Sequence, residues 1–259
     1  MTISGLVKFL GTNYIDADIT LSATSADTDN KEFLYDRSSS SKLQSIGSTD
    51  LIPEVWEITF AGTRTFDRLL FSLHNIKLGE VKYWNGTAWA SFSTPASWSA
   101  NSATTSYFEF NSVSTKKIQI TMTTTIIVDA EKYITEAFSF LELGTLVKNP
   151  KKANPDFPEN SKKQKTSQGG TLYTFFGSKF KVKLDILQAP EADFTLYKTL
   201  KNRAEPFFVY LCGGQTGYTE YGFRINDIYL VNYVNSLKYK LSSTAHGSGV
   251  DIKIELREV

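Results

Sequence analysis

The stretch KNPKKANPDFPENSKKQKTSQ, residues 148–168, divides the rest of the chain. It holds three of the seven prolines and six of the twenty-eight Lys and Arg residues, and Phe157 is its only large apolar residue. Because proline removes a backbone donor and disfavours helix at the preceding residue, the Asn-Pro and Phe-Pro pairs favour an extended chain. Such a segment cannot form a core. We therefore expect a Pro- and Lys-rich linker between two domains, residues 1–147 and 169–259.

Length and composition agree with two folded domains, because 41% apolar and 14% aromatic residues suffice for buried cores. The formal net charge of +1 hides an uneven distribution. Residues 1–147 carry 11 basic and 16 acidic side chains, residues 148–168 carry 6 and 2, and residues 169–259 carry 11 and 9. A nucleic-acid-binding domain should show a basic face, whereas the basic excess here lies in the linker, so we expect no specific nucleic-acid partner.

Few residues are suited to redox or metal chemistry. The single cysteine, Cys212, excludes an intrachain disulfide, and the two histidines, His74 and His246, are too far apart to suggest a zinc site. We expect neither a metal nor a cofactor. The first residues lack the pattern of a secretory signal, and no run approaches eighteen apolar residues, which predicts synthesis in a cytoplasm and no membrane insertion.

Short runs rich in Thr, Val, Ile, Tyr and Phe fill the first domain, with turn residues between them. Several alternate between apolar and polar residues, which is typical of strands with one buried face. The expected strands are Leu51–Phe60, Arg68–His74, Glu80–Trp84, Tyr107–Phe110, Lys117–Met122 and Ala137–Leu143. This pattern predicts an antiparallel β-sandwich of the jelly-roll type.

The run Trp84-Asn85-Gly86-Thr87-Ala88-Trp89 predicts a hairpin within this domain. Asn-Gly favours the two positive φ angles of a tight primed turn. Trp84 and Trp89 would then be near neighbours across the two strands.

The order of motifs over residues 30–144 resembles a discoidin, or galactose-binding-like, jelly roll. The motifs are LYDRSSSSKLQS, EVWEITF, FDRLLFSLHNIK, VKYWNGTAWASF, KKIQITM and AFSFLELG. In many such domains the loop matching Asp36 holds a structural calcium together with a carboxylate near the last strand, where this chain has Glu142. Serines follow Asp36 where further ligands would stand, so the resemblance does not predict calcium here.

Carbohydrate recognition is the specific function that this domain suggests, because sugar sites pair exposed aromatic rings with polar groups. Ser91–Thr105 is rich in Ser, Thr and Ala and predicts a long exposed loop, so Trp98 in its middle is the best candidate for a partner contact. The alternative is structural: tryptophans that pack across a hairpin, and a buried strand end. The candidates are Trp84, Trp89, Trp98, Asn85, His74 and Asn75.

The second domain begins with two strands separated by Gly177-Ser178, and the second of them, Lys179–Ile186, alternates strictly. Pro190 and the acidic residues that follow predict the start of a helix that continues to Arg203. Further strands are expected at Pro206–Leu211, Phe223–Leu230, Leu237–Leu241 and Val250–Leu256.

This order of elements resembles the β-sandwich with one helix that phage tail tube, distal tail and baseplate hub proteins share. The motifs are FKVKLDILQAP, EADFTLYKTLKNR, EPFFVYL, GFRINDIYL and VDIKIELREV. In those families neighbouring sheets assemble into a ring around a channel, most often with sixfold symmetry. The resemblance implies a mainly β chain whose second domain is tail-tube-like and forms a homo-oligomeric ring.

Strand edges give a physical argument for the same assembly. Lys179–Ile186 and the terminal strand are long and lack proline, and a monomer that exposed such edges would aggregate. Joining the edges between subunits would protect them. The alternative is that both strands are internal to one sandwich.

No catalytic constellation is evident. The chain lacks nucleotide-binding glycine motifs, a nucleophile elbow and a paired-histidine zinc motif. Asp16 with Asp18, or Asp27 with Asp29, could form a carboxylate pair, but they stand among Ser, Thr and Asn as solvated loop residues do. We therefore do not expect an enzyme.

The leading hypothesis is a structural component of a phage tail tip or baseplate, located in the virion tail. The second domain would form the ring, and the first would decorate it or dock other tail proteins. The alternative is a carbohydrate-binding host-adhesion protein that contacts surface glycan. The linker, net +4 beside a first domain at −5, would act as an assembly arm through Lys151, Lys152, Lys162 and Lys163.

Overall fold

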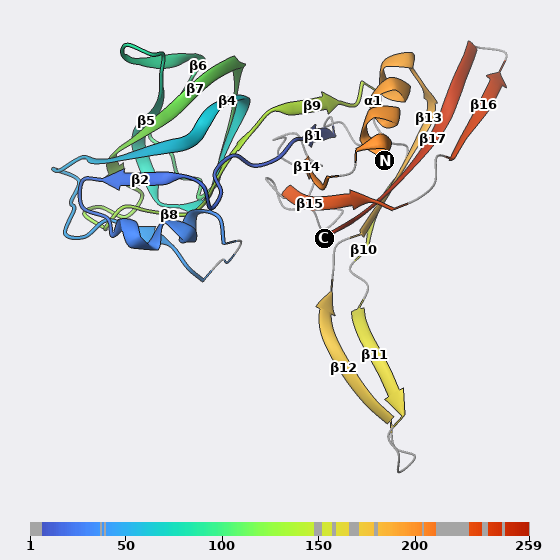
Figure 1. Cartoon of the computed structure of the whole chain (residues 1–259), viewed down its shortest axis with the longest axis horizontal. Helices are drawn as coiled ribbons and strands as arrows, with labels where there is room; N and C mark the ends of the chain where they lie inside the picture. The colour runs from blue at the N-terminus through green and yellow to red at the C-terminus, as the bar shows by residue number, and fades with distance from the viewer. Residues whose placement is uncertain are drawn as a thin grey trace. The chain divides into compact units, whose positions relative to one another are not determined.

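The computed structural model describes residues 7–36, 38, 40–147, 152–156, 159–165, 171–178, 181–203, 205–210, 228–234, 238–244 and 247–258. Its contacts divide the chain into two compact units, Thr12–Glu142 and a second unit that combines Met1–Gly11 with Leu143–Val259 (Figure 1). We call the first unit the inserted domain and the second the split domain. The chain therefore crosses between domains twice, near residues 11 and 142, and not once through residues 148–168 as the sequence predicts.

The inserted domain is a seven-stranded antiparallel sheet in the order β3-β8-β4-β7-β5-β6, with β2 paired to β4. Its elements are β2 (Thr20–Ala23), the 3-10 helix η1 (Thr28–Leu34), β3 (Leu43–Gln44), β4 (Glu54–His74), β5 (Ile76–Trp84), β6 (Trp89–Trp98), β7 (Ser106–Thr125) and β8 (Tyr133–Phe140). The pairing of β4 with β7 shifts register between Thr59 and Arg64, and residues on both sides of this shift contribute to one core. This confirms the mainly β, antiparallel sandwich class.

Alternation of side chains builds that core. Trp56, Ile58 and Phe60 are buried on β4, while the residues between them are half-buried. Ile118 and Ile120 of β7 are the register partners of Ile58 and Trp56. The two-residue period of the sequence thus predicts which side of each strand faces the core.

The split domain contains an eight-stranded sheet in the order β10-β13-β17-β15-β14-β1-β9, with β16 paired to β17. Its strands are β1 (Lys8–Leu10), β9 (Glu142–Thr145), β10 (Lys152–Asp156), β13 (Lys181–Ala189), β14 (Phe207–Tyr210), β15 (Ile228–Tyr233), β16 (Lys238–Thr244) and β17 (Gly247–Glu258). Phe9 of β1 is the register partner of Val209 of β14. Both ends of the chain therefore belong to one sheet.

The two long strands β13 and β17 lie inside this sheet. They pair with each other, placing Leu184 opposite Ile254 on the buried side and Lys183 opposite Glu255 on the other. β10 lies on the far side of β13 and β15 on the far side of β17. The expectation that their edges are open is wrong, and the alternative that both are internal is confirmed, because strands distant in sequence cover the edges.

One α-helix, α1 (Glu191–Asn202), follows β13 and begins after Pro190, as predicted. Tyr197 and Leu200 are buried against the sheet. The carboxylate of Asp193 is also buried, and it accepts a hydrogen bond of 2.7 Å from the backbone nitrogen of Val147. The helix thus connects to the strand segment that enters this domain.

Residues 148–168 contain two strands where a linker is expected. β10 pairs with β13 at the end of the eight-stranded sheet, and β11 (Glu159–Lys165) pairs with β12 (Thr171–Ser178) as a separate two-stranded sheet (Figure 1). Proline is tolerated in a strand at a sheet edge, so Pro155 does not prevent β10 from forming. Pro155 therefore lies in an edge strand of the split domain.

Candidate functional site

The best predicted contact residue, Trp98, is a core residue. Only 3% of it is exposed, and its Nε1 donates a hydrogen bond of 2.8 Å to Ser106 Oγ. Its ring packs against Phe71 and Phe108. The loop expected at Ser91–Thr105 is wrong over its first half, because β6 runs through Trp98 and pairs with β5.

His74 is buried beside Trp98 and serves the same network. Its Nδ1 accepts a hydrogen bond of 3.1 Å from the backbone nitrogen of Ile76, and its Nε2 lies 2.8 Å from Ser106 Oγ. Because Nδ1 accepts, the proton of a neutral ring is on Nε2 and points to Ser106. Burial lowers the pKa of His74 to about 4, so the ring is neutral near pH 7. The structural alternative for His74 is therefore the observed one.

Trp84 and Trp89 do face each other across the predicted hairpin. Their ring centroids are 5.4 Å apart in an edge-to-face arrangement, and both side chains are half-buried. The turn differs from the predicted one: Asn85 does not have a positive φ, and the backbone nitrogen of Asn85 bonds to the oxygen of Ala88. The side-chain oxygen of Asn85 accepts from the nitrogens of Thr87 and Ala88, which stabilises a longer loop. Asn85 thus has a structural use.

Three of the four predicted assembly lysines lie in described strands. Lys152 is in β10 opposite Asp185, and Lys162 and Lys163 are in β11 opposite Thr174 and Tyr173. Other predictions fall outside the described residues, namely those for Lys151, Cys212 and His246.

The carboxylates considered as candidate ligands or catalytic groups form hydrogen bonds or ion pairs within the protein. Asp36 accepts hydrogen bonds from Ser38 and Ser41, and Glu142 forms an ion pair with Arg68. Asp16 and Asp27 each accept from a backbone nitrogen two residues later, as turn residues do. Within the described ranges, no three His, Cys, Asp or Glu side chains gather as a metal site would require.

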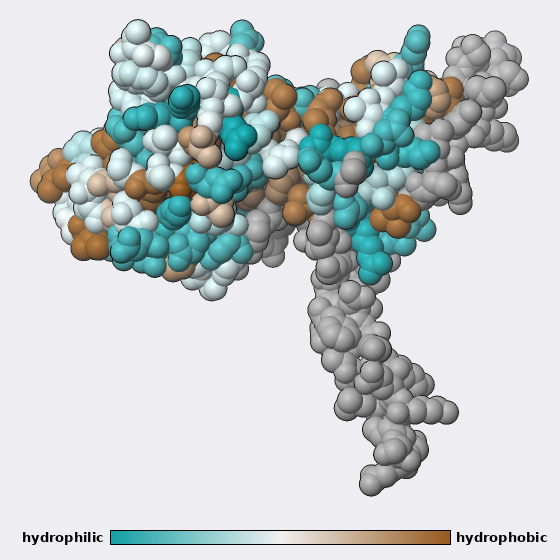
Figure 2. All heavy atoms as spheres, viewed as in Figure 1, coloured by the Kyte–Doolittle hydropathy of each residue, from teal (hydrophilic) through white to brown (hydrophobic). Residues whose placement is uncertain are grey.

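Sequence reasoning missed an exposed apolar surface, which we call the apical tip. It consists of five aliphatic side chains on two loops of the inserted domain, residues 45–52 and 126–131. Their exposed fractions are 65% for Ile46, 90% for Leu51, 54% for Ile52, 73% for Ile127 and 69% for Val128. Figure 2 shows apolar side chains at the left-hand edge of this domain. Two apolar runs in these loops have the composition of strands, so the sequence does not indicate that they are loops. They are Leu51-Ile52 and Ile126-Ile127-Val128.

Hydrogen bonds join the two loops of the apical tip. The backbone nitrogen of Ser45 donates to the oxygen of Lys132 over 2.8 Å, and the nitrogen of Lys132 donates to Ser45 Oγ over 2.9 Å. The nitrogen of Gly47 donates to Glu131 Oε1 over 3.0 Å. This bond and one from Gln44 lower the pKa of Glu131. The apolar side chains therefore stand on a cross-linked base.

The ammonium of Lys132 is buried in this base. Its Nζ donates to the backbone oxygens of Thr49 and Ile52 over 2.6 and 3.0 Å. Burial lowers the pKa of Lys132, while the carboxylates of Asp50 and Glu54 oppose that shift. Burial would raise the pKa of Asp50, but hydrogen bonds from Thr125 more than offset it and the pKa is lowered. A pre-formed apolar surface of this kind can bind a partner.

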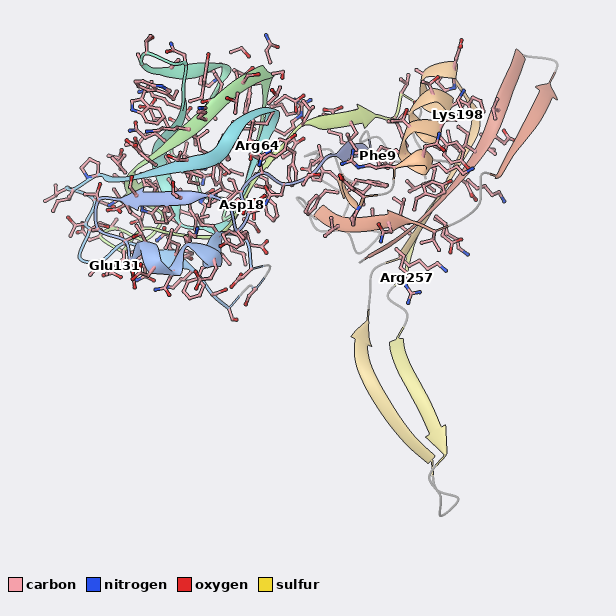
Figure 3. The ribbon with its side chains drawn as sticks, in the orientation of Figure 1. Phe9, Asp18, Arg64, Glu131, Lys198 and Arg257 are labelled. Atoms are coloured by element: carbon pink, nitrogen blue, oxygen red, sulfur yellow. The ribbon has the colours of Figure 1, made fainter. Side chains whose placement is uncertain are left out.

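The apical tip lies at the end of the inserted domain away from its chain connections. Strand β8 runs from Ile134, beside the tip, to Phe140, beside Glu142, which spans about 20 Å at ~3.3 Å per residue. Figure 3 shows Glu131 of the tip and Arg64 at opposite ends of the domain. The tip is therefore free of the two connections to the split domain.

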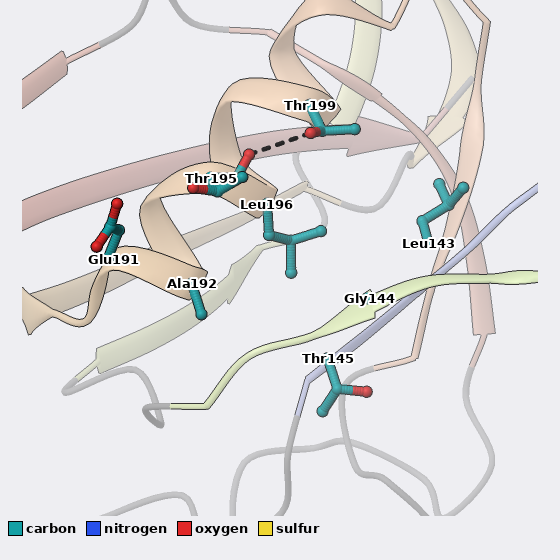
Figure 4. A pocket seen from close by; sticks show the side chains of 8 residues that line it. All are labelled: Leu143, Gly144, Thr145, Glu191, Ala192, Thr195, Leu196 and Thr199. Atoms are coloured by element: carbon teal, nitrogen blue, oxygen red, sulfur yellow. Dashed lines mark hydrogen bonds between the residues drawn. The ribbon is translucent and has the colours of Figure 1, made fainter.

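A shallow groove of about 600 Å³ lies in the split domain between β9 and α1 (Figure 4). It is lined by Leu143, Gly144, Thr145, Glu191, Ala192, Thr195, Leu196 and Thr199. Thr199 Oγ1 donates to the backbone oxygen of Thr195 over 3.1 Å, and Glu191 is the one ionisable residue in the lining. The groove offers little for catalysis.

No family model and no curated protein matches the sequence. Solved structures that resemble about half of the chain include a chitosan-binding module of a chitosanase/glucanase from Paenibacillus sp. IK-5, at 13% identity and a TM-score of 0.43, covering 50% of this chain and 98% of that one. A module from Clostridium perfringens in complex with GalNAc-β-1,3-galactose has 14% identity and a TM-score of 0.41, covering 50% and 99%. The family 32 module of C. perfringens NanJ in complex with galactose has 16% identity and a TM-score of 0.40, covering 52% and 98%.

In the described part of the chain, no helix is long and apolar enough to cross a membrane.

Proposed function

We propose that this protein is a structural component of a phage tail tip or baseplate. The split domain forms a homo-oligomeric ring, and the inserted domain decorates the ring and holds neighbouring tail proteins. The resemblance of the split domain's sequence to tail-tube-like proteins motivates the biological setting.

The two-stranded sheet of β11 and β12 is the observation that supports assembly best. Within the described ranges these strands pair only with each other. A two-stranded hairpin is marginally stable in water without further strands or a packed face. Strand β12 has the sequence TLYTFFGS, which is rich in large apolar residues. Contacts with a neighbouring subunit would supply the missing stabilisation.

The inserted domain favours docking over chemistry. Its titratable groups that might have formed a catalytic pair are hydrogen-bonded within turns or paired with arginine. Its apical tip instead presents five exposed apolar side chains to solvent. An exposed cluster of this kind is typical of an interaction surface.

Light scattering on the purified protein, followed by electron microscopy, tests the proposal. We expect closed oligomers in solution and the protein in the tail of the assembled particle. A strict monomer at high protein concentration, absent from any tail assembly, would contradict it.

Glycan binding is a second candidate, supported by the half-exposed edge-to-face pair of Trp84 and Trp89. Exposed aromatic rings form platforms for sugars. A glycan array with wild-type protein and Trp84→Ala tests it. Binding that the substitution abolishes would support this function, and an array without any signal would remove it.

A further inference from the structure

We propose that the apical tip of one copy docks on the split domain of a second copy of this chain. The inference rests on the oligomer of the proposed function and names the surface through which the inserted domain would join it. The tip would carry the apolar centre of the contact and carboxylates at its margin.

The apolar part of the tip is unusually exposed for a folded domain. Leu51 is 90% exposed and Ile127 is 73% exposed, although both belong to a base held by hydrogen bonds and a buried ammonium. Because the base is already ordered, binding would not require these loops to fold first, which favours affinity. The surface is thus suited to a protein partner.

The charges of the tip select the kind of partner. The charged side chains of loops 45–52 and 126–131 are Asp50, Asp129 and Glu131, all carboxylates, and the neighbouring Lys132 is buried. An acidic margin is repelled by an anionic bilayer, and the tip lacks the Trp, Tyr, Lys and Arg residues that favour a membrane interface. It also lacks an aromatic platform for a sugar. A basic protein surface fits best.

The split domain of the chain has the opposite net charge to the inserted domain. The inserted domain has ten basic and sixteen acidic side chains, and the split domain has eighteen and eleven, so the domains carry net charges of −6 and +7. On the exposed side of the β13–β17 pair, four basic residues, Lys181, Lys183, Lys253 and Arg257, alternate with three acidic ones, Asp185, Asp251 and Glu255, and both Lys181 and Lys183 form ion pairs with Glu255. Opposite charges of this size favour contact between unlike domains and disfavour contact between like domains.

The position of the tip favours a neighbouring copy. The tip lies at the far end of β8 from Glu142, where the inserted domain joins its own split domain. A tip-to-split-domain contact uses two different surfaces, and contacts of this kind close into rings or continue as filaments. The geometry therefore agrees with a repeating assembly.

A photo-crosslinking amino acid at position 128 of the full chain tests the contact. Val128 is 69% exposed and makes no part of the hydrogen-bonded base. The matched control places the same amino acid at Ala88, an exposed residue of the hairpin at the opposite end of the domain. Mixing ¹⁴N- and ¹⁵N-labelled copies identifies products that join two molecules.

We expect position 128 to yield crosslinked pairs of copies whose second peptide comes from residues 143–258, and position 88 to yield at least tenfold less. Raising sodium chloride from 0.05 to 0.5 M should reduce the yield severalfold, because screening weakens contact between opposite charges. Asp129→Asn keeps a hydrogen-bond acceptor but removes a charge, so it should also reduce the yield, whereas Asp18→Asn near the opposite end should not.

Three results would overturn the proposal: no intermolecular product, products only with peptides of the inserted domain, or capture of added lipid vesicles in place of protein. The ring is tested separately by microscopy. Rings without the crosslink would reject this contact and leave the proposed function standing. The crosslink without rings would support this contact and contradict the ring of the proposed function.

Discussion

Ser106 Oγ is the common partner of two buried side chains, Trp98 and His74. The indole and the imidazole each lie 2.8 Å from this oxygen, and their rings meet at 5.5 Å between centroids. Each polar nitrogen is satisfied inside the core, which is the condition for burying it at low cost. At this scale, a tryptophan and a histidine that could have contacted a ligand are instead parts of the core.

The buried His74 should make stability depend on pH. Its pKa is about 4 in the folded protein and 6.5 ordinarily, so the unfolded chain binds more protons between these values. This difference in pKa contributes about 3 kcal/mol to the free energy of unfolding. The contribution is fully present above pH 6.5 and is lost as the pH falls to about 4. Urea unfolding between pH 7 and 4 measures it. In His74→Gln the loss over this range should be smaller by about that amount, and equal losses in both proteins would contradict the assignment.

Trp98 should matter to stability far more than the half-buried pair of Trp84 and Trp89. Trp98→Ala removes a buried ring and should reduce the free energy of unfolding by about 3–5 kcal/mol. Trp84→Ala, the matched control, loses one edge-to-face contact and should cost about 1 kcal/mol. Urea unfolding at pH 7 compares them. Similar small effects would mean that Trp98 is a surface residue after all.

Among the elements, the two loops of the apical tip depend on an ammonium group. Lys132 lies 83 and 80 residues from Thr49 and Ile52, yet its Nζ bonds to the backbone oxygens of both. No local pattern predicts this, because a lysine in the run DAEKYI would ordinarily be solvated. The loops hold their shape through this long-range contact.

Lys132→Met should loosen the tip without removing any of its exposed side chains. The substitution leaves two backbone oxygens without their donor and should cost about 1–3 kcal/mol. Hydrogen exchange at residues 45–52 should become faster, and urea unfolding gives the energy. Lys42→Met is the control, because Lys42 is exposed and donates no hydrogen bond to Thr49 or Ile52; its Nζ lies over the ring of Tyr133, at 4.6 Å. Unchanged exchange in Lys132→Met would show that the ammonium is dispensable.

At the scale of the whole molecule, charge separates along the domains. The boundary that the contacts define gives net charges of −6 and +7, a larger contrast than the predicted boundary at residue 147. Strands β10 and β11 belong to the split domain, so the lysines of residues 148–168 add to its positive charge. Assembly should respond to these charges.

Replacing Lys151, Lys152, Lys162 and Lys163 with Ser should weaken self-association, because it removes four positive charges from the split domain. Light scattering should show a shift toward monomer, by several-fold in the dissociation constant at low salt. The matched control replaces four lysines of the inserted domain, Lys42, Lys77, Lys116 and Lys117. Assembly that stays unchanged would leave residues 148–168 with only a role within their own sheets.

Local elements of the split domain could be predicted well. Helix α1 begins after Pro190 as expected, and β13 and β17 show the expected alternation. The apical tip could not be predicted, because Leu51 and Ile127 have the composition of strand residues and become exposed only through the loops that carry them. Among the candidate contact residues, Trp84 and Trp89 form the cross-strand pair that the sequence predicts. The burial of Trp98 could not be predicted from its local sequence.

The sequence by itself determined the β class, the helix after Pro190 and the faces of the strands, because these follow from periods of two and of 3.6 residues over short windows. Tertiary structure alone decided the domain boundary, since β1 joins β14 from the opposite end of the chain. It also decided which tryptophan is buried and where an ammonium joins two loops. Burial and long-range pairing depend on residues that are far apart in sequence, and no local period contains that information.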